Sequence, residues 1–232
     1  MTDALIKHIP ASVIILAAGK GSRMQQATPK QFITVHGKPV LFHSIKPFLS
    51  ALPHAELIIV VPPGEVAFCK EQMHQWFPGM SFQITEGGET RFHSVKNGLA
   101  LIKKTEIILV HDSARCLLTA ELVERVFRSA VEMGSAIPAI ACHDSVRLTD
   151  QGTSRPLDRD QIRLVQTPQA FKSDIILKAF HADYRPSFTD EATVVEANGC
   201  FVNLVEGEET NIKITRPGDL ERAESILRSR SE

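Results

Sequence analysis

Short, continuous runs of large apolar residues recur along this chain, and segments with helical periodicity lie between them. The clearest runs are at 13–16, 57–61 and 107–110, and further strands are expected at 80–85 and 135–141. Strands that are apolar throughout are buried on both faces, as in parallel sheets that carry helices on both sides. The alternation therefore predicts an α/β domain, in which ligands bind beyond the carboxyl ends of the strands.

Size and composition fit one domain of this class. The chain has 232 residues, and 43% of them are hydrophobic, which is enough for a single continuous core. The net charge is −1, so no global field attracts nucleic acid or an anionic membrane, and neither partner is expected. The polar start of the chain does not resemble a signal peptide, and no apolar run reaches the roughly 18 residues of a membrane span. Four widely spaced cysteines without a C-x-x-C motif indicate reduced thiols, and a cytoplasmic protein is expected.

The first apolar strand leads into a loop that combines glycines with uncompensated positive charge. Gly19 and Gly21 let the backbone turn tightly and approach a ligand closely, although a plain turn is the alternative. Residues 4–55 contain no Asp or Glu. The cations in that stretch are Lys7, Lys20, Arg23, Lys30, Lys38 and Lys46. No Walker A pattern is present, and Met24 occupies the place of the third glycine of a dinucleotide fingerprint, so a longer loop around a triphosphate is predicted.

Polar residues at later strand ends are the other candidates for a site. Asp112 follows a buried strand, where a carboxylate can hold Mg²⁺ against phosphates, and capping of a turn is the alternative. Gly87-Gly88 frees the backbone to contact a base edge, while Arg91 and Ser94 share one face of the next helix. Lys213, flanked by isoleucines in a predicted strand, is a weaker candidate. The nine histidines form no catalytic or metal-binding motif.

The segment 142–163 differs from the rest of the chain because it is rich in Asp and Arg and poor in apolar residues. It therefore cannot lie in the core. Val146 and Leu148 alternate with polar neighbours before an Asp-Gln-Gly turn, which predicts a β-hairpin arm, with a disordered loop as the alternative. An ordered arm needs a partner surface, most economically a second copy of the chain. We expect one domain spanning 1–232, with 142–163 as its dimerisation arm.

Eight short motifs follow one another over nearly the whole chain. They are Ala17-Ala18-Gly19-x-Gly21-x-Arg23-Met24, Pro29-Lys30-Gln31, Gly37-x-Pro39-Val40, Gly87-Gly88-x-x-Arg91-x-x-Ser94-Val95, His111-Asp112-x-Ala114-Arg115, Gln166-Thr167-Pro168-Gln169, Thr189-Asp190-Glu191 and Asn211-Ile212-Lys213. Together they resemble the motifs of the 2-C-methyl-D-erythritol 4-phosphate cytidylyltransferase family. The resemblance implies a Rossmann-like three-layer α/β domain with a mainly parallel central sheet and a projecting β-hairpin arm. It also implies a homodimer that uses Mg²⁺ to transfer CMP from CTP to the polyol phosphate, releasing pyrophosphate, in the non-mevalonate route to isoprenoid precursors.

The same resemblance assigns roles to individual residues. The implied catalytic residues are Arg23, Lys30, Lys213 and Arg159. The expected nucleotide-binding residues, including the glycines and Arg91 discussed above, are Ala17, Ala18, Gly19, Gly21, Gly88, Glu89, Arg91 and Ser94. The implied polyol-phosphate pocket holds Ser113, Arg115, Thr167 and Lys213, with Ser145 and Arg159 from the partner's arm. Asp112 matches the acidic residue beside the metal.

Three residues depart from the family pattern in and near the acceptor pocket, and three other functions stay open at this point. Cys116 stands where the family usually has proline, while Ser113 and Ser145 replace the commoner alanine and threonine, which predicts a tuned pocket with intact chemistry. The alternatives are a ribitol 5-phosphate cytidylyltransferase, a non-catalytic nucleotide-binding regulator and an NAD-type oxidoreductase. The intact cations and Asp112 disfavour the regulator, and Met24 disfavours the oxidoreductase.

Overall fold

The computed structural model describes residues 8–19 and 29–230, and its centre is an eight-stranded, mainly parallel sheet. The strand order is β10-β7-β11-β6-β1-β4-β5, and β12 pairs with β7. The strands are β1 (Ala11–Leu16), β4 (Glu56–Val61), β5 (Gln83–Glu86), β6 (Ile107–Asp112), β7 (Ser135–Ala141), β10 (Arg163–Val165), β11 (Gln169–Lys172) and β12 (Leu204–Glu206). β1 lies between β4 and β6 and is parallel to both, so the strands that were predicted from apolar runs form the middle of the sheet.

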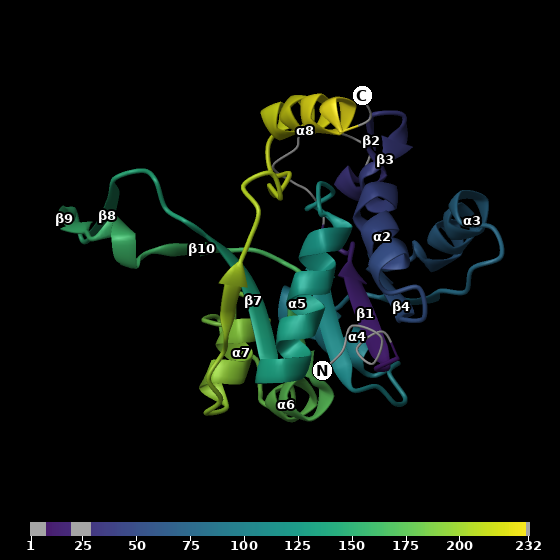
Figure 1. Cartoon of the computed structure of the whole chain (residues 1–232), viewed down its shortest axis with the longest axis horizontal. Coiled ribbons are helices and arrows are strands. Elements are labelled where there is room, and N and C mark those ends of the chain that lie inside the picture. The colour runs from purple at the N-terminus through teal and green to yellow at the C-terminus, as the bar shows by residue number, and fades with distance from the viewer. Residues whose placement is uncertain (1–7, 20–28, 231–232) are drawn as a thin grey trace.

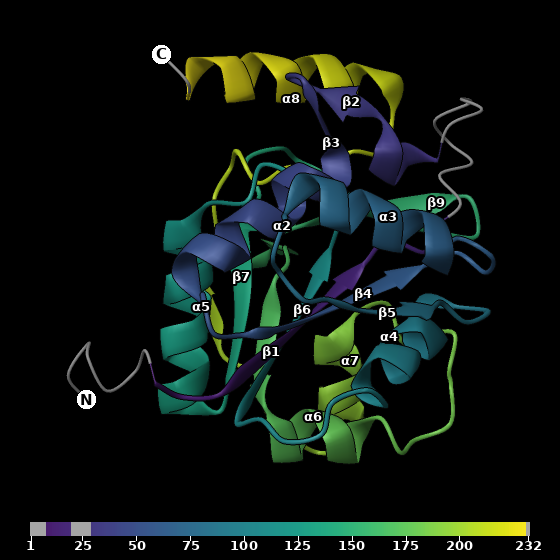
Figure 2. The same cartoon turned by 90° about the vertical axis from the view of Figure 1, so that its right-hand side faces the viewer.

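Helices cover both faces of this sheet, which gives three layers (Figures 1 and 2). One face packs against α2 (Val40–Ala51), α3 (Val66–Trp76) and α5 (Ala120–Met133), and the other against α4 (Arg91–Leu99), α6 (Ser173–Ala179) and α7 (Glu191–Ala197). Successive strand residues serve opposite layers: Val13 and Ile15 contact the first set, and Ile14 contacts the second. This two-sided burial explains why β1 is apolar at every position from Val13 to Leu16.

The helix α5 shows how local sequence sets an element's ends. The side chain of Thr119 accepts a hydrogen bond from the Leu122 amide and caps the first turn. Gly134 ends the helix with φ +88°, a left-handed conformation that glycine adopts without a Cβ penalty. Between these caps, Leu122, Val126 and their apolar neighbours face the sheet.

A third, smaller cluster lies at the end of the domain where the sheet's strands terminate. The helix α8 (Pro217–Ser229) packs there against the short hairpin of β2 (Thr34–Val35) and β3 (Lys38–Pro39) (Figure 2). The 3₁₀ helix η2 (Lys30–Phe32) comes directly before β2, so this cluster supports the segment that carries Lys30.

The segment predicted to be an arm forms a β-hairpin that projects from the body of the domain (Figure 1). Its strands, β8 (Val146–Asp150) and β9 (Thr153–Leu157), pair only with each other among the described residues. Gln151 and Gly152 both have positive φ, which matches the twist of a tight hairpin. The predicted fold class, a three-layer α/β domain with a projecting hairpin, is confirmed.

Several boundaries differ from those expected. β5 begins at Gln83, later than the predicted start at residue 80. The antiparallel strand β11 was not predicted, because its four residues begin with a polar one and are too short for a periodicity signal. The strand expected around Lys213 is wrong, since this segment is irregular and is held at Ile214 by a hydrogen bond to Ala114.

Candidate active site

A pocket of about 700 Å³ opens at the carboxyl edge of the central strands, where the fold class predicts a ligand. The residues that line it follow β1, β4, β5 and β6, and η2 and the segment around Lys213 close its sides. The predicted site residues among them are Ala17, Ala18, Gly19, Lys30, Gly88, Glu89, Arg91, Ser94, Asp112, Ser113 and Lys213. Segments up to about two hundred residues apart in sequence therefore meet here.

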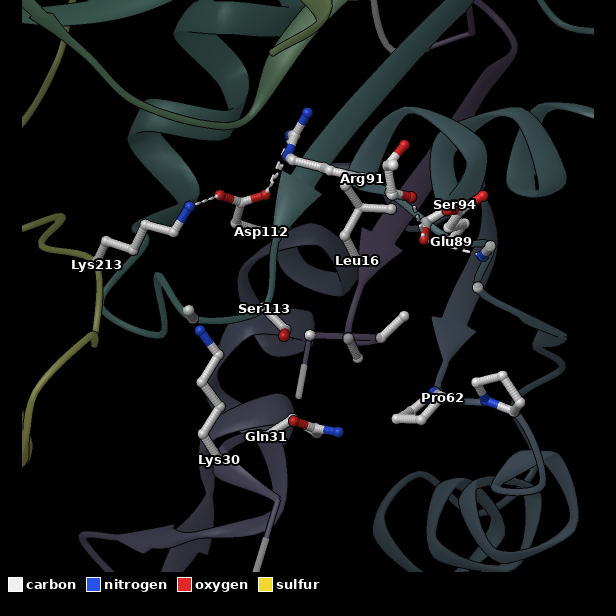
Figure 3. Close-up of a pocket in the computed structure, with 18 residues that line it drawn as sticks. Leu16, Lys30, Gln31, Pro62, Glu89, Arg91, Ser94, Asp112, Ser113 and Lys213 are labelled. Atoms are coloured by element: carbon white, nitrogen blue, oxygen red, sulfur yellow. Dashed lines mark hydrogen bonds and ion pairs between the residues drawn. The ribbon is translucent and has the colours of Figure 1, made fainter. Parts of the chain in front are cut away.

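One wall of the pocket is a chain of alternating charges (Figure 3). Arg91 donates from Nε and Nη2 to Oδ1 of Asp112, each at 3.1 Å, and Nζ of Lys213 lies 2.5 Å from Oδ2. On its other side, Arg91 forms a bidentate pair with Glu191, at 2.5 and 3.0 Å. Each oxygen of Asp112 thus has its own cationic partner, which fixes the orientation of the carboxylate.

These contacts determine which groups carry charge. Burial alone raises the pKa of the Asp112 carboxyl, but Arg91 and Lys213 outweigh it and hold that pKa well below the ordinary value. Burial alone lowers the pKa of Arg91, and the two carboxylates outweigh that effect and raise it. Asp112 is therefore an anion and Arg91 a cation at neutral pH.

The opposite wall is built from backbone close to the start of α4. The amide of Gly88 donates to Oγ of Ser94 at 3.1 Å, and the Ser94 hydroxyl donates to the carbonyl of Thr90 at 3.0 Å. A Cβ on Gly87 would lie 2.4 Å from Cβ of Ala18, so only glycine fits there. Arg91, which belongs to the charged wall, is the nearest cation to these groups among the described residues, and its guanidinium is already paired with two carboxylates. The wall of Gly88 and Ser94 is therefore suited to a neutral group such as a base or sugar.

Comparison with known proteins gives the same family name for the sequence and for the structure. The family model for 2-C-methyl-D-erythritol 4-phosphate cytidylyltransferase matches residues 11–229. The enzyme of that name from Bacteroides thetaiotaomicron is 42% identical over 217 residues, covering 93% of this chain and 99% of its own. A relative from Bacteroides fragilis with the same name is 40% identical over 216 residues, with the same coverage of both chains. The crystal structure of the Thermus thermophilus enzyme superposes with a TM-score of 0.74 at 33% identity, covering 94% of this chain and 98% of that one.

This chain belongs to the 2-C-methyl-D-erythritol 4-phosphate cytidylyltransferase family. The family resemblance predicted from the eight motifs is confirmed, and the chain is an enzyme, a nucleotidyltransferase of the cytidylyltransferase class. None of these relatives carries the name of the ribitol phosphate enzyme, of a regulator or of an oxidoreductase, and those alternatives are not favoured.

The remaining predicted site residues of this cytidylyltransferase are not among the described residues that line the pocket. Gly21 and Arg23 fall outside the described residues. Arg115 lies behind the lining, where its guanidinium donates to the carbonyls of Asn211 and Val165. Ser145 and Arg159 belong to the exposed arm, so they do not line the pocket of their own chain. The predicted roles of all these residues stay predictions.

Thr167, predicted to bind the polyol phosphate, takes part in a buried relay with His111. Its Oγ1 accepts from the Asp112 amide at 3.0 Å and lies 3.0 Å from Nδ1 of His111, whose Nε2 lies 3.2 Å from the Arg115 carbonyl. A neutral imidazole satisfies every contact if Nε2 carries the proton. The relay fixes the backbone of Asp112, a structural function that the sequence did not predict for either residue.

Lowering the pH is expected to destabilise this enzyme in part through His111. Burial lowers the pKa of the imidazole from 6.5 to about 3. Below pH 6.5 the unfolded chain therefore binds a proton that the folded chain refuses, and the free energy of unfolding falls by about 1.4 kcal/mol per pH unit until the folded group titrates. Urea unfolding at several pH values should show a shallower acid dependence for His111→Gln than for the wild type, and identical slopes would contradict the prediction.

Two residues of the site were not assigned roles from the sequence. Glu191 is fully buried behind Arg91, yet an acid in the first turn of a helix is ordinarily read as favouring the helix dipole. Gln31 lines the pocket beside Lys30, but its place in the motif Pro29-Lys30-Gln31 assigned no role to its side chain. Only the three-dimensional contacts identify these two side chains.

Glu191→Gln is expected to lower the free energy of unfolding by roughly 3 kcal/mol, the lower end of the range for breaking a buried ion pair. The variant leaves the Arg91 cation with only one carboxylate, and the partial exposure of Arg91 limits the loss. Glu196→Gln on the same helix is the matched control, because Glu196 is exposed and should change stability by at most about 0.5 kcal/mol. Equal denaturation midpoints for the two variants would refute this account of Glu191.

Proposed function

We propose that this cytidylyltransferase transfers CMP from CTP to 2-C-methyl-D-erythritol 4-phosphate and releases pyrophosphate. A phosphate oxygen of the acceptor attacks the α-phosphorus, and the bond to the oxygen bridging the α- and β-phosphorus breaks as pyrophosphate leaves. The proposal is carried by the two-sided pocket, in which Lys30 and Lys213 lie on one side and Ser94 on the other, where its hydroxyl accepts from the Gly88 amide. The relatives' names supply the two substrates.

The proposed mechanism depends on charge neutralisation and positioning. The acceptor phosphate is already an anion, so its attack needs no general base. His111 is buried, neutral and occupied at both nitrogens, so it is not available for proton transfer. Lys30 and Lys213 would stabilise the charge that develops on the triphosphate, together with Arg23, which lies outside the described residues.

Asp112 is the residue that we propose holds Mg²⁺. Among the described residues, no group of three His, Cys, Asp or Glu side chains forms a complete metal site. Magnesium often binds through one or two carboxylates with substrate phosphates and waters as its other ligands, so a single fixed, ionised Asp112 fits a metal that arrives with CTP. When bound, the ion neutralises charge on the phosphates. Lys213 occupies Oδ2 of Asp112 and has to release it if the metal takes that oxygen.

We also propose that the enzyme is a homodimer in which residues 142–163 of each chain complete the partner's acceptor pocket. Leu148, Leu164 and Val165 on the arm and its base are 44–48% exposed, which leaves apolar surface for a partner to cover. In this arrangement Ser145 and Arg159 bind the polyol phosphate of the other protomer, and the whole chain, 1–232, acts as one nucleotidyltransferase domain with 142–163 as its arm.

A cytoplasmic location without membrane or nucleic-acid partners completes the proposal. All four cysteines are free, as is usual for proteins in reducing compartments. Over residues 8–19 and 29–230, no helix has the length and apolar character needed to cross a bilayer.

Pyrophosphate release tests the proposed reaction. Purified enzyme with Mg²⁺ and CTP should release pyrophosphate rapidly with 2-C-methyl-D-erythritol 4-phosphate and slowly with ribitol 5-phosphate. Faster release with ribitol 5-phosphate would identify the enzyme as a ribitol 5-phosphate cytidylyltransferase. No release with either acceptor would refute both.

A further inference from the structure

The side chain of Gln31 is the most unusual polar group in the pocket. The residue is only 1% exposed, yet neither Nε2 nor Oε1 has a hydrogen-bond partner among the described residues. An amide buried in this way loses its hydration without compensation, so such groups are rare in native proteins and call for a partner, such as a bound ligand, water or ion. Gln31 also lines the pocket that holds Lys30, Asp112 and Ser113.

The Gln31 side chain points away from the lysines of the pocket. Lys30 and Gln31 are consecutive in the 3₁₀ helix η2, where neighbouring side chains point about 120° apart. Figure 3 shows the Lys30 amine on the side of Lys213 and Asp112, and the Gln31 amide turned toward Pro62. The two residues therefore reach different parts of one ligand.

The chemistry of the amide indicates which part it contacts. A carboxamide offers one acceptor and two donor hydrogens and carries no charge. Ionised phosphate oxygens only accept, so a phosphate would leave Oε1 without a partner. Ribose hydroxyls and the polar edge of cytosine present both donors and acceptors, which can satisfy both ends of the amide.

We propose that Gln31 is a nucleoside-binding residue that hydrogen-bonds the ribose or cytosine of CTP through both Nε2 and Oε1. This inference rests on the proposed use of CTP. It assigns to η2 a double function, in which Lys30 contacts the triphosphate and Gln31 the nucleoside. The unpaired amide reduces the stability of the unliganded protein, and the nucleotide compensates for it on binding.

The test is the variant Gln31→Met, which keeps side-chain length and removes both polar ends. Without ligand, Tm should rise by about 2–4 °C, because an unpaired buried amide has been replaced by an apolar group. Calorimetric titration should show CTP binding weakened by roughly tenfold or more, while inorganic triphosphate, which lacks the nucleoside, binds within about twofold of wild type. In steady-state kinetics the loss should appear in KM for CTP with little change in kcat.

Gln169→Met is the matched control for stability, since Gln169 is also 1% exposed but fully bonded, to Asp190 and to the Ala192 amide. Its Tm should fall, opposite to that of Gln31→Met. A fall in Tm for Gln31→Met would show that the amide is paired within the protein and would overturn the proposal. Equal weakening of CTP and triphosphate, or no weakening of either, would also overturn it.

Titrations with CTP and with 2′-deoxy-CTP identify the group that Gln31 contacts. A Gln31-dependent loss with CTP that disappears with 2′-deoxy-CTP assigns the contact to the 2′-hydroxyl of the ribose, and a loss that persists assigns it to the 3′-hydroxyl or the base. If wild-type enzyme binds no CTP, the proposed function fails. If wild type binds CTP and Gln31→Met binds it equally well, only the inference about Gln31 fails.

Discussion

Lys30→Ala is expected to lower kcat for CMP transfer by at least about 10²-fold, the scale seen when one preorganised charge stabiliser is removed. Lys30 lines the pocket, and its Cε lies 3.9 Å from the position that a Cβ on Gly19 would take, so the stem packs beside the first glycine of the loop. The hairpin β2–β3 and α8 support the segment that follows η2. A cation held in this way needs little reorganisation when negative charge develops on the triphosphate.

Single-turnover measurement at saturating CTP separates this effect from binding. Lys38→Ala is the matched control: Lys38 is exposed on β3, with its Nζ 5.3 Å from the Phe42 ring centre, and its loss should leave turnover within about twofold. A Lys30→Ala enzyme with higher KM for CTP but unchanged kcat would mean that the cation binds ground state and transition state equally, contrary to the proposed role.

The sequence predicted the middle of this fold better than its edges, for physical reasons. β1, β4 and β6 are buried on both faces, so their apolar runs are long and unambiguous. β11 and the irregular segment at Lys213 are set by tertiary contacts, such as the Ile214 amide to the Ala114 carbonyl, and these leave no local pattern. The isoleucines beside Lys213 therefore predict a strand from the sequence, although they are apolar only because they pack into the interior.

Some features of the site could likewise be predicted from the sequence, and others could not. Lys30, Asp112 and the glycines after β5 could be predicted, because strand ends in a parallel sheet converge on one edge. The partners of Arg91 could not, since Asp112 is 21 residues away in the chain and Glu191 is 100 residues away. Sequence reasoning placed Arg91 among the nucleotide-binding residues, and the structure adds that its guanidinium is already bound by two carboxylates. Its contribution to nucleotide binding therefore has to come through the orientation of Asp112 or through surface that the carboxylates leave free.

Deleting residues 144–160 is expected to give a monomer that binds CTP but does not use the acceptor. β8 and β9 pair only with each other among the described residues, so the body of the domain keeps its core when they are removed. The deletion removes Ser145 and Arg159, the proposed polyol-phosphate contacts in the partner's pocket. Light scattering should report the monomer mass, titration should retain CTP affinity, and pyrophosphate release should drop to background. A truncated enzyme with full activity would contradict the shared site.

Mixed dimers test the same prediction without removing the arm. In a dimer of one Lys30→Ala chain and one Arg159→Ala chain, the pocket of the second chain keeps its own Lys30 and receives an intact Arg159 from the first. Two nearly inactive preparations should therefore recover roughly a quarter of wild-type activity after random subunit exchange, since about half of the dimers are mixed and each holds one complete site. If the arm served its own chain, every pocket would lack one of the two groups, and mixing would restore nothing.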